Sequence, residues 1–190
     1  MPENSHADNT TAVDIATWND QIVAEVRASN GYATWSTHEE FAAGRPVPPW
    51  TPGMERLGWD RQRGMPLILV HHIGAKTGRR RISPLFYQAV GDDWAVFGTH
   101  GGSAHHPAWY RNLLADPHTT VETGAASVPV VARLTQGAER ELIWTKQVAR
   151  VPKFAEFQAA AGREIPVVVL ERTSRRRTST GGPSSPVAAS

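Results

Sequence analysis

The chain has 190 residues, of which 40% are hydrophobic, which is enough for one hydrophobic core, so we expect one main domain. It has no cysteine, which excludes disulfides, zinc–thiolate sites, iron–sulfur clusters and cysteine nucleophiles. Lysine and arginine total 20 against 18 aspartates and glutamates, and this near balance argues against a general nucleic-acid surface. There is no run of roughly 18 apolar residues and no signal-peptide pattern, so we expect a cytoplasmic protein.

The two ends of the chain differ from the part between them. Residues 1–12 and 174–190 are rich in small and polar residues with almost nothing to bury, so we expect disordered tails on a domain that spans 13–173. Within residues 13–29, Ile15, Trp18, Ile22 and Val26 recur at the spacing of one helix face. The sequence therefore predicts an amphipathic helix that packs against the rest of the domain.

Residues 32–63 combine four prolines with three tryptophans. Prolines interrupt regular structure, whereas tryptophans bury large apolar surfaces, so we expect an irregular but packed insertion. We interpret it as a lid or an insertion.

The remaining residues alternate short apolar runs with amphipathic stretches. Six runs are enriched in β-branched or aromatic residues and bounded by Gly, Asp or Pro, which is typical of antiparallel strands. They cover residues 66–73, 82–90, 93–100, 119–124, 127–135 and 165–172. Helices are predicted at 107–115, 137–149 and 152–161. The fold class is thus α+β, a small antiparallel barrel with flanking helices.

Between the first two predicted strands lies a basic turn, GAKTGRRR, at residues 74–81. At the tip of a hairpin, its N–H groups, the Thr77 hydroxyl, Lys76 and the guanidinium fork of Arg81 suit a phosphate. A nucleotide-triphosphatase loop is excluded, because Ala75 stands directly before the lysine and a strand follows instead of a helix. From these residues alone, an ordinary solvated basic hairpin stays open as the alternative.

The predicted strand at 93–100 leads into a glycine-rich loop and then into the helix at 107–115. Gly101 and Gly102 allow the backbone to approach a flat ligand, and the helix N-terminus offers free N–H groups. A planar cofactor with a polar edge would suit this place.

Histidines suggest a metal site, but the pattern does not support one. Three of them gather at positions 100, 105 and 106 without an acidic ligand between 98 and 107, and His71 and His72 are adjacent in a strand, so they face opposite ways. We therefore predict no metal. No Gly-x-Ser-x-Gly elbow or HExxH pair occurs, so hydrolase chemistry has no support either.

The two motifs occur in an order that resembles the deazaflavin-dependent nitroreductase family. The matching features are KTGRRR (76–81) with Pro84-Leu85, the GG loop, HPAWYRNL (106–113) and IPVVVLERT (165–173). The resemblance implies a split β-barrel of the flavin-reductase and pyridoxamine-phosphate-oxidase type, with about six antiparallel strands and flanking helices. It also implies coenzyme F-420, an 8-hydroxy-5-deazaflavin, as the cofactor.

By position, the resemblance assigns the cofactor's phosphate and acidic glutamyl tail to the turn, at Lys76, Thr77, Gly78 and Arg81. It assigns the deazaflavin ring to a second set of residues, namely Leu69, Thr99, His100, Gly101, Ala108, Trp109 and Asn112. Val151, Phe154 and Phe157 fall at the acceptor pocket, where the best-known nitroimidazole-activating member has tyrosines, so the pocket here is expected to be more apolar. Core packing stays the alternative for these aromatic residues.

The implied activity is hydride transfer from the reduced deazaflavin to a small planar acceptor such as a quinone, a nitroaromatic or an enone. Such a reaction needs position and the exclusion of water more than acid–base chemistry. We hypothesise that His100 hydrogen-bonds the cofactor or helps to protonate the reduced acceptor, which makes it the candidate catalytic residue.

Two alternatives remain open, a split barrel that binds flavin mononucleotide and a non-catalytic carrier of a cofactor, heme or lipid. The density of cations between Lys76 and Arg81 favours the acidic tail of the deazaflavin. The expected partner is a small-molecule acceptor, with no nucleic acid and no membrane insertion. The arginines at 175–177 leave a peripheral membrane contact open, and both a monomer and a homodimer are compatible with the sequence.

Overall fold

A computed structural model describes residues 10–33 and 65–173 of the chain. Its first elements are α1 (Thr10–Ala28), β1 (Tyr32–Ala33), β2 (Met65–Pro66), β3 (Ile68–Ile73), β4 (Arg80–Leu85), β5 (Tyr87–Val90) and β6 (Asp93–Phe97). They are followed by η2 (His100–Gly102), α3 (Ala108–Ala115), β7 (His118–Thr123), β8 (Ala126–Leu134), α4 (Gly137–Arg150), α5 (Lys153–Ala161) and β9 (Val167–Arg172). Residues 1–9 and 174–190 of the predicted tails, and residues 34–63 of the predicted insertion, lie outside the described residues.

The predicted helices and strands are present, and three of them need correction. The predicted strand at 82–90 is divided at Phe86 into β4 and β5. The predicted strand at 93–100 ends at Phe97, because the backbone then enters the short 3-10 turn η2 at His100. The first helix starts at Thr10, three residues before the predicted start.

The strands form an antiparallel sheet in the order β4-β3-β7-β8-β9-β6-β5, and β1 and β2 form a separate pair. The main sheet thus has seven strands where about six were expected, because the run at 82–90 contributes to both edges. β4 pairs with β3 and β5 pairs with β6, although only Phe86 separates β4 from β5 in the chain. Since Leu85 and Tyr87 can lie at most about 7.6 Å apart, the two edges meet and the sheet curls into a split β-barrel.

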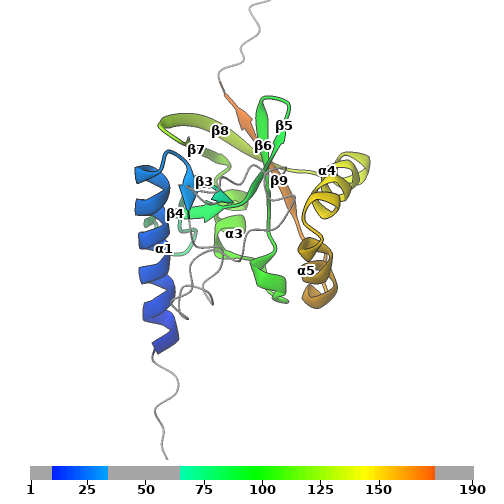
Figure 1. Cartoon of the computed structure of the whole chain (residues 1–190), viewed down its shortest axis with the longest axis horizontal. Helices are drawn as coiled ribbons and strands as arrows, with labels where there is room; N and C mark the ends of the chain where they lie inside the picture. Colours follow the sequence, from blue (N-terminus) through cyan, green and yellow to red (C-terminus); the bar gives the residue numbers. More distant parts are fainter. Residues whose placement is uncertain (1–9, 34–64, 174–190) are drawn as a thin grey trace, which may run out of the picture.

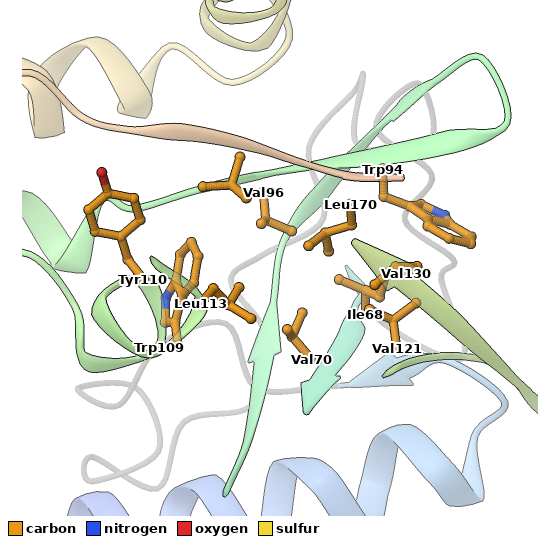
Figure 2. Close-up of a cluster of buried hydrophobic side chains, with 11 residues drawn as sticks. Ile68, Val70, Trp94, Val96, Trp109, Tyr110, Leu113, Val121, Val130 and Leu170 are labelled. Carbon is orange, nitrogen blue, oxygen red and sulfur yellow. The ribbon is translucent and has the colours of Figure 1, made fainter. Parts of the chain in front are cut away.

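Alternate residues of the strands point into the barrel. Ile68 and Val70 from β3 meet Val168 and Leu170 from β9 in one buried cluster. α3 adds Trp109, Tyr110 and Leu113 to this cluster from one side, as Figure 2 shows. Each fully buried aliphatic side chain stabilises the fold by roughly 1.5–3 kcal/mol relative to an exposed one.

The residues between them point outward and are covered by helices. Val167 and Val169 of β9 pack with Phe97, Ile143 and Phe154 under α4 and α5. Figure 1 shows α4 and α5 on the side of the barrel opposite to α1. Because β9 is buried on both faces, its sequence is a continuous apolar run instead of an alternating one.

α1 covers the outer face of β3, where Ile22, Val23 and Val26 pack on Leu67 and Leu69. Polar contacts add to this packing. Arg27 forms a two-pronged ion pair with Glu122 of β7, at 2.9 and 2.7 Å. His71 Nε2 lies 2.5 Å from the same carboxylate.

This ion pair has an electrostatic consequence. The hydrogen bond from Arg27, and the weaker contribution of His71, lower the pKa of Glu122 to about 2. The carboxylate therefore stays charged and attached to α1 over the physiological pH range.

In the described part of the chain, no helix is long and apolar enough to cross a membrane.

Candidate functional site

The basic turn has the geometry of a tight hairpin tip. β3 and β4 pair up to Ile73 and Arg80, and Gly74 N–H then donates to Arg79 C=O at 2.8 Å. A Cβ at Gly74 would lie 2.6 Å from Thr77 Oγ1, so the turn requires glycine there. Gly78 has a φ of +65°, which also favours glycine. The predicted hairpin is thus confirmed, and its two glycines are needed for different reasons.

The cations of this turn are free to meet a ligand. Lys76, Arg79, Arg80 and Arg81 are all exposed. Within residues 10–33 and 65–173, none of them forms a salt bridge, whereas Arg27, Arg133 and Arg140 all do. The turn therefore concentrates positive charge that the described part of the protein does not neutralise.

A buried polar network holds the turn against α3. Asn112 Oδ1 accepts a hydrogen bond from Ala75 N–H at 3.0 Å, and Asn112 Nδ2 donates to His72 Nδ1 at 2.9 Å. His72 Nε2 in turn lies 3.0 Å from Ser83 Oγ. Because Nδ1 accepts, the proton of the neutral ring is on Nε2, which donates to Ser83.

His72 stays neutral in this environment. Burial is the main cause that lowers its pKa to about 4, and the positive charges of Arg81 and His71 add to it. A neutral His72 can accept from Asn112, whereas a protonated one cannot. The position of the turn thus depends on an uncharged histidine inside the barrel wall.

The glycine loop at 98–105 has an unusual backbone. His100, Gly101 and Gly102 have consecutive positive φ angles of 49°, 62° and 83°. A Cβ at Gly102 would lie 3.1 Å from the Cβ of Ala160 in α5, and one at Gly98 would lie 2.6 Å from Cγ of Pro166. Glycine is needed both for the backbone conformation and for the close approach of the loop to its neighbours.

His100 lies exposed at the start of η2. Its Nδ1 is 3.1 Å from the carbonyl oxygen of His105. Since a carbonyl only accepts, Nδ1 carries the proton in this contact and the Nε2 atom of the neutral ring is left free to take up a proton. This arrangement is compatible with a proton carrier.

The loop lies between two helices. It leads into α3, whose first residue, Ala108, lies about 6 Å along the axis, or just over one helical turn, from Asn112, the residue that holds the basic turn. On its other side, α5 packs on the loop through Phe157 and Ala160 beside Gly102. The basic turn, α3, the loop and α5 thus form one continuous series of contacts.

The predicted residues are distributed unevenly over this series. Lys76, Thr77, Gly78 and Arg81 are exposed on the turn, and Thr99, His100 and Gly101 lie together in the loop. Ala108 is exposed at the start of α3, whereas Trp109 and Asn112 are buried. Leu69 lies apart from them, because its side chain is fully buried under α1.

The predicted acceptor residues lie where α4 passes into α5. Phe154 is buried, with its ring 5.2 Å from that of Phe97 in an edge-to-face arrangement. Phe157 and Val151 are half-buried and pack against the same cluster. This wall is therefore aromatic and apolar, and Phe157 is the member that lies beside the glycine loop.

Three residues of this region were missed by the sequence analysis. His72 and Gln158 make buried or half-buried polar contacts that no spacing indicates. Arg163, which follows the glycine that ends α5, donates to the carbonyls of Gly98 and Ser103 at 3.0 and 3.1 Å. A lone arginine after a helix gives no sequence signal for such a role.

A separate cavity of about 500 Å³ lies between β1, β2 and the turn that joins β7 to β8. It is at the opposite end of the β3–β4 hairpin from the basic turn, about 20 Å away for strands of this length. None of its lining residues is charged, so it is poorly suited to an acidic ligand.

Among residues 10–33 and 65–173, no three His, Asp or Glu side chains gather closely enough to hold a metal ion.

Comparisons with known proteins identify the family of the chain. A family model described as F420H(2)-dependent quinone reductase matches residues 55–172. A putative F420H(2)-dependent quinone reductase of Mycobacterium tuberculosis is 32% identical over 115 residues, which are 60% of this chain and 97% of that protein. Another quinone reductase of the same description and organism is 31% identical over 120 residues, covering 62% of this chain and 80% of that protein.

A solved structure of a reductase with the same cofactor is also similar to this chain. The protein described as an F420-H2 dependent reductase (FDR-A) is 36% identical and superposes with a TM-score of 0.51. The superposition covers 55% of this chain and 93% of that one. The likeness therefore extends over nearly the whole of that relative and over little more than half of this chain.

Proposed function

Because the chain belongs to the F420H(2)-dependent quinone reductase family, we propose that its basic turn and its glycine loop bind coenzyme F-420 and present it to a small planar acceptor. Membership of the family makes the protein an oxidoreductase that depends on this cofactor. Bound at the site, the reduced deazaflavin supplies a hydride. The residues described below bind, orient and shield the two reactants.

The free cations of the turn carry this proposal. A phosphate with an acidic glutamyl tail needs several positive charges in a row, and Lys76 and Arg81 are exposed without a described salt-bridge partner. The Thr77 hydroxyl would add a hydrogen-bond donor between them, and Gly78, whose N–H already donates to Gly74 C=O at 2.7 Å, would allow the turn conformation that presents these groups. Flavin mononucleotide also has a phosphate, but it has no acidic tail that would need so many cations.

For the ring, we propose the loop residues Thr99, His100 and Gly101 together with Ala108, at the N-terminal end of α3. Asn112 would act indirectly, because both ends of its side chain amide are already bonded to Ala75 and His72. Leu69 and Trp109 would support the site from the buried side, since neither side chain is exposed.

For the acceptor, we propose the wall formed by Val151, Phe154 and Phe157. None of these three side chains carries a hydroxyl group, so shape and apolar contact would select flat molecules such as quinones. Such a wall discriminates weakly between similar apolar ligands. A nitroaromatic or an enone would therefore also be accepted.

His100 is our candidate for the residue that donates the proton that a reduced quinone oxygen needs. The donation of its Nδ1–H to His105 leaves Nε2 as the atom that takes up and delivers a proton. It would act from the loop that holds the ring, in a cytoplasmic enzyme whose partner is a small molecule and not nucleic acid. Both a monomer and a homodimer fit this proposal.

The proposal is tested by a binding and turnover experiment on the purified full chain. We would titrate it with reduced coenzyme F-420, flavin mononucleotide and nicotinamide coenzymes, and then follow oxidation of each bound donor after menadione is added. Saturable binding of the deazaflavin with menadione-dependent oxidation is expected. Tight binding of flavin mononucleotide alone would overturn the proposal, and binding of the deazaflavin without oxidation would identify a carrier.

A further inference from the structure

Arg163 contacts the glycine loop at four places. Its Nε donates to Ser103 C=O at 3.1 Å, and its Nη2 lies 3.0, 3.4 and 3.1 Å from the carbonyl oxygens of Gly98, Thr99 and His105. A guanidinium is planar, and its N–H groups point in fixed directions. The four carbonyls must therefore keep one arrangement around it, which constrains both ends of the loop.

These contacts also orient the opposite side of the loop. In a trans peptide the N–H points away from the C=O, so the N–H groups of His100 and His106 point away from Arg163. The loop thus turns four carbonyls toward the arginine and the N–H groups of His100 and His106 toward the other side. A ligand with carbonyl oxygens on its edge suits that side.

Arg163 is itself fixed to α5. It follows Gly162, whose φ of +60° ends the helix. Gln158 of α5 donates through Nε2 to Arg163 C=O at 2.5 Å and accepts from Ile165 N–H at 3.0 Å. The arginine is thus anchored to the helix that carries Phe154 and Phe157.

Arg163 therefore links two parts of the proposed site. The loop carries the proposed ring contacts, and α5 carries the proposed acceptor wall. Gly102 also lies close to α5, because a Cβ at this position would be only 3.1 Å from the Cβ of Ala160 and 3.5 Å from the backbone of Phe157. Among the described residues, Arg163 forms no salt bridge, so the loop carbonyls receive most of its hydrogen bonds.

On the basis of the proposed function, we propose that Arg163 is a positioning residue that fixes the glycine loop against α5 and thereby sets the distance between the cofactor ring and the acceptor. Hydride transfer is sensitive to this distance, and a misplacement of about 1 Å can lower a rate roughly 100-fold. A role limited to stability would change the amount of folded protein without changing the rate of the folded enzyme.

The test compares Arg163→Met and Arg163→Lys with the control Arg172→Met. Arg172 also donates to a backbone carbonyl, that of Asp92 at 2.7 Å, and lies over the Trp94 ring, away from the loop. We expect Arg163→Met to lower kcat with reduced F-420 and menadione by roughly 10- to 100-fold. The dissociation constant of the cofactor should change by no more than about threefold, because the turn is untouched.

Hydrogen exchange of the cofactor-free protein is the second measurement. In Arg163→Met, amides of residues 98–105 should exchange faster while those of the barrel strands keep their protection, and Arg172→Met should leave the loop unchanged. Arg163→Lys should also lose most of the rate, since an ammonium cannot contact four carbonyls with fixed geometry. If Arg163→Met does not fold, Arg163→Lys is subjected to both measurements.

Three outcomes would overturn the inference. They are a full rate in either variant, unchanged exchange of the loop, and a loss of rate that Arg172→Met reproduces. Failure of the proposed function would look different, because the wild-type protein would then not oxidise reduced F-420. The exchange measurement would still decide whether Arg163 holds the loop.

Discussion

The two halves of the site are built differently. The turn at 74–81 presents four exposed cations and is held to α3 by one side-chain hydrogen bond, from Ala75 to Asn112. The loop at 98–105 presents backbone groups and is held by Arg163 at four carbonyls. Charge acts over several ångströms and tolerates movement, whereas hydride transfer does not.

We infer from this difference that the turn serves mainly to capture the cofactor and the loop mainly to position it. Loss of the turn should then appear in the dissociation constant, and loss of the loop geometry in kcat. A protein in which both changes had the same effect on both constants would contradict this division.

The largest effect is expected from Lys76→Ala combined with Arg81→Ala. Charge-assisted hydrogen bonds contribute about 1.5–3 kcal/mol each, and some of this is lost to screening at an exposed turn. We therefore expect cofactor affinity to fall by roughly 100- to 1,000-fold at low ionic strength, with a smaller change in high salt. Titration of the cofactor at two salt concentrations measures this.

The matched control is Lys146→Ala with Arg172→Ala, which removes the same charge from α4 and β9. It should lower affinity only slightly, because these residues lie outside the turn. Equal losses in the two double variants would mean that the overall charge attracts the cofactor and that the turn has no specific role.

The second prediction concerns pH and the support of the turn. The pKa of His72 is about 4 in the folded protein against 6.5 for a free histidine, because of burial and the charge of Arg81. The unfolded chain therefore takes up the proton first as the pH falls. The contribution of His72 to stability is fully present above pH 6.5, is lost between 6.5 and 4, and amounts to at most about 3 kcal/mol.

Urea unfolding at several pH values measures this loss, and two variants separate its sources. His72→Gln can still accept from Asn112 but does not titrate, so most of the loss between pH 6.5 and 4 should disappear, and only the part from His106, whose pKa is also lowered by burial, should remain. Glu122→Gln should leave that range unchanged and alter the range from 4.5 down to 2, where protonation of Glu122 breaks its pair with Arg27. A loss between 6.5 and 4 that is as large in His72→Gln as in the wild-type protein would disprove the assignment.

A smaller effect is expected when the contact between turn and α3 is removed. Asn112→Ala leaves Ala75 N–H and His72 Nδ1 without their partner, which costs about 1–3 kcal/mol of stability. Cofactor affinity should fall roughly tenfold because the turn becomes less ordered. Asn112→Asp keeps an acceptor for Ala75, so it should retain more affinity than Asn112→Ala. Equal affinities in the two variants would show that this contact does not order the turn.

These residues also show how far sequence reasoning reaches. Elements were predictable where one local signal determined them. The apolar run at 165–172 predicted a strand, and the glycines at 74–81 predicted a turn between two strands. The division of the strand at Phe86 was not predictable, because a bent strand that joins both sheet edges has the same local composition as a straight one. Local patterns specify elements, while the closure of the barrel depends on pairings far apart in the chain.

The same limit applies to the site. Lys76 and Arg81 were assigned to the cofactor from the density of cations in the turn together with the family motif, because the cations alone also suit an ordinary solvated hairpin. Asn112 was assigned to the cofactor by position, although its side chain joins Ala75 to His72. Arg163 was missed because its role depends on the tertiary approach of α5 to the loop, and a single arginine carries no periodicity.

The smallest effect is expected at His100, and it tests whether the loop does more than position the ring. His100 has a φ of 49°, which asparagine also adopts readily, so His100→Asn preserves the backbone and can still donate to His105 C=O. The asparagine amide cannot take up and release a proton as an imidazole ring can. We expect kcat with menadione to fall about tenfold, which is less than the roughly 100-fold or more usual for a lost general acid, because water reaches this exposed position, while cofactor affinity is retained. His100→Gly keeps the backbone but loses the bond to His105, so a greater loss in His100→Gly than in His100→Asn would measure the positioning role separately. Unchanged turnover in His100→Asn would assign the proton to solvent and leave the loop a purely positional part of the site.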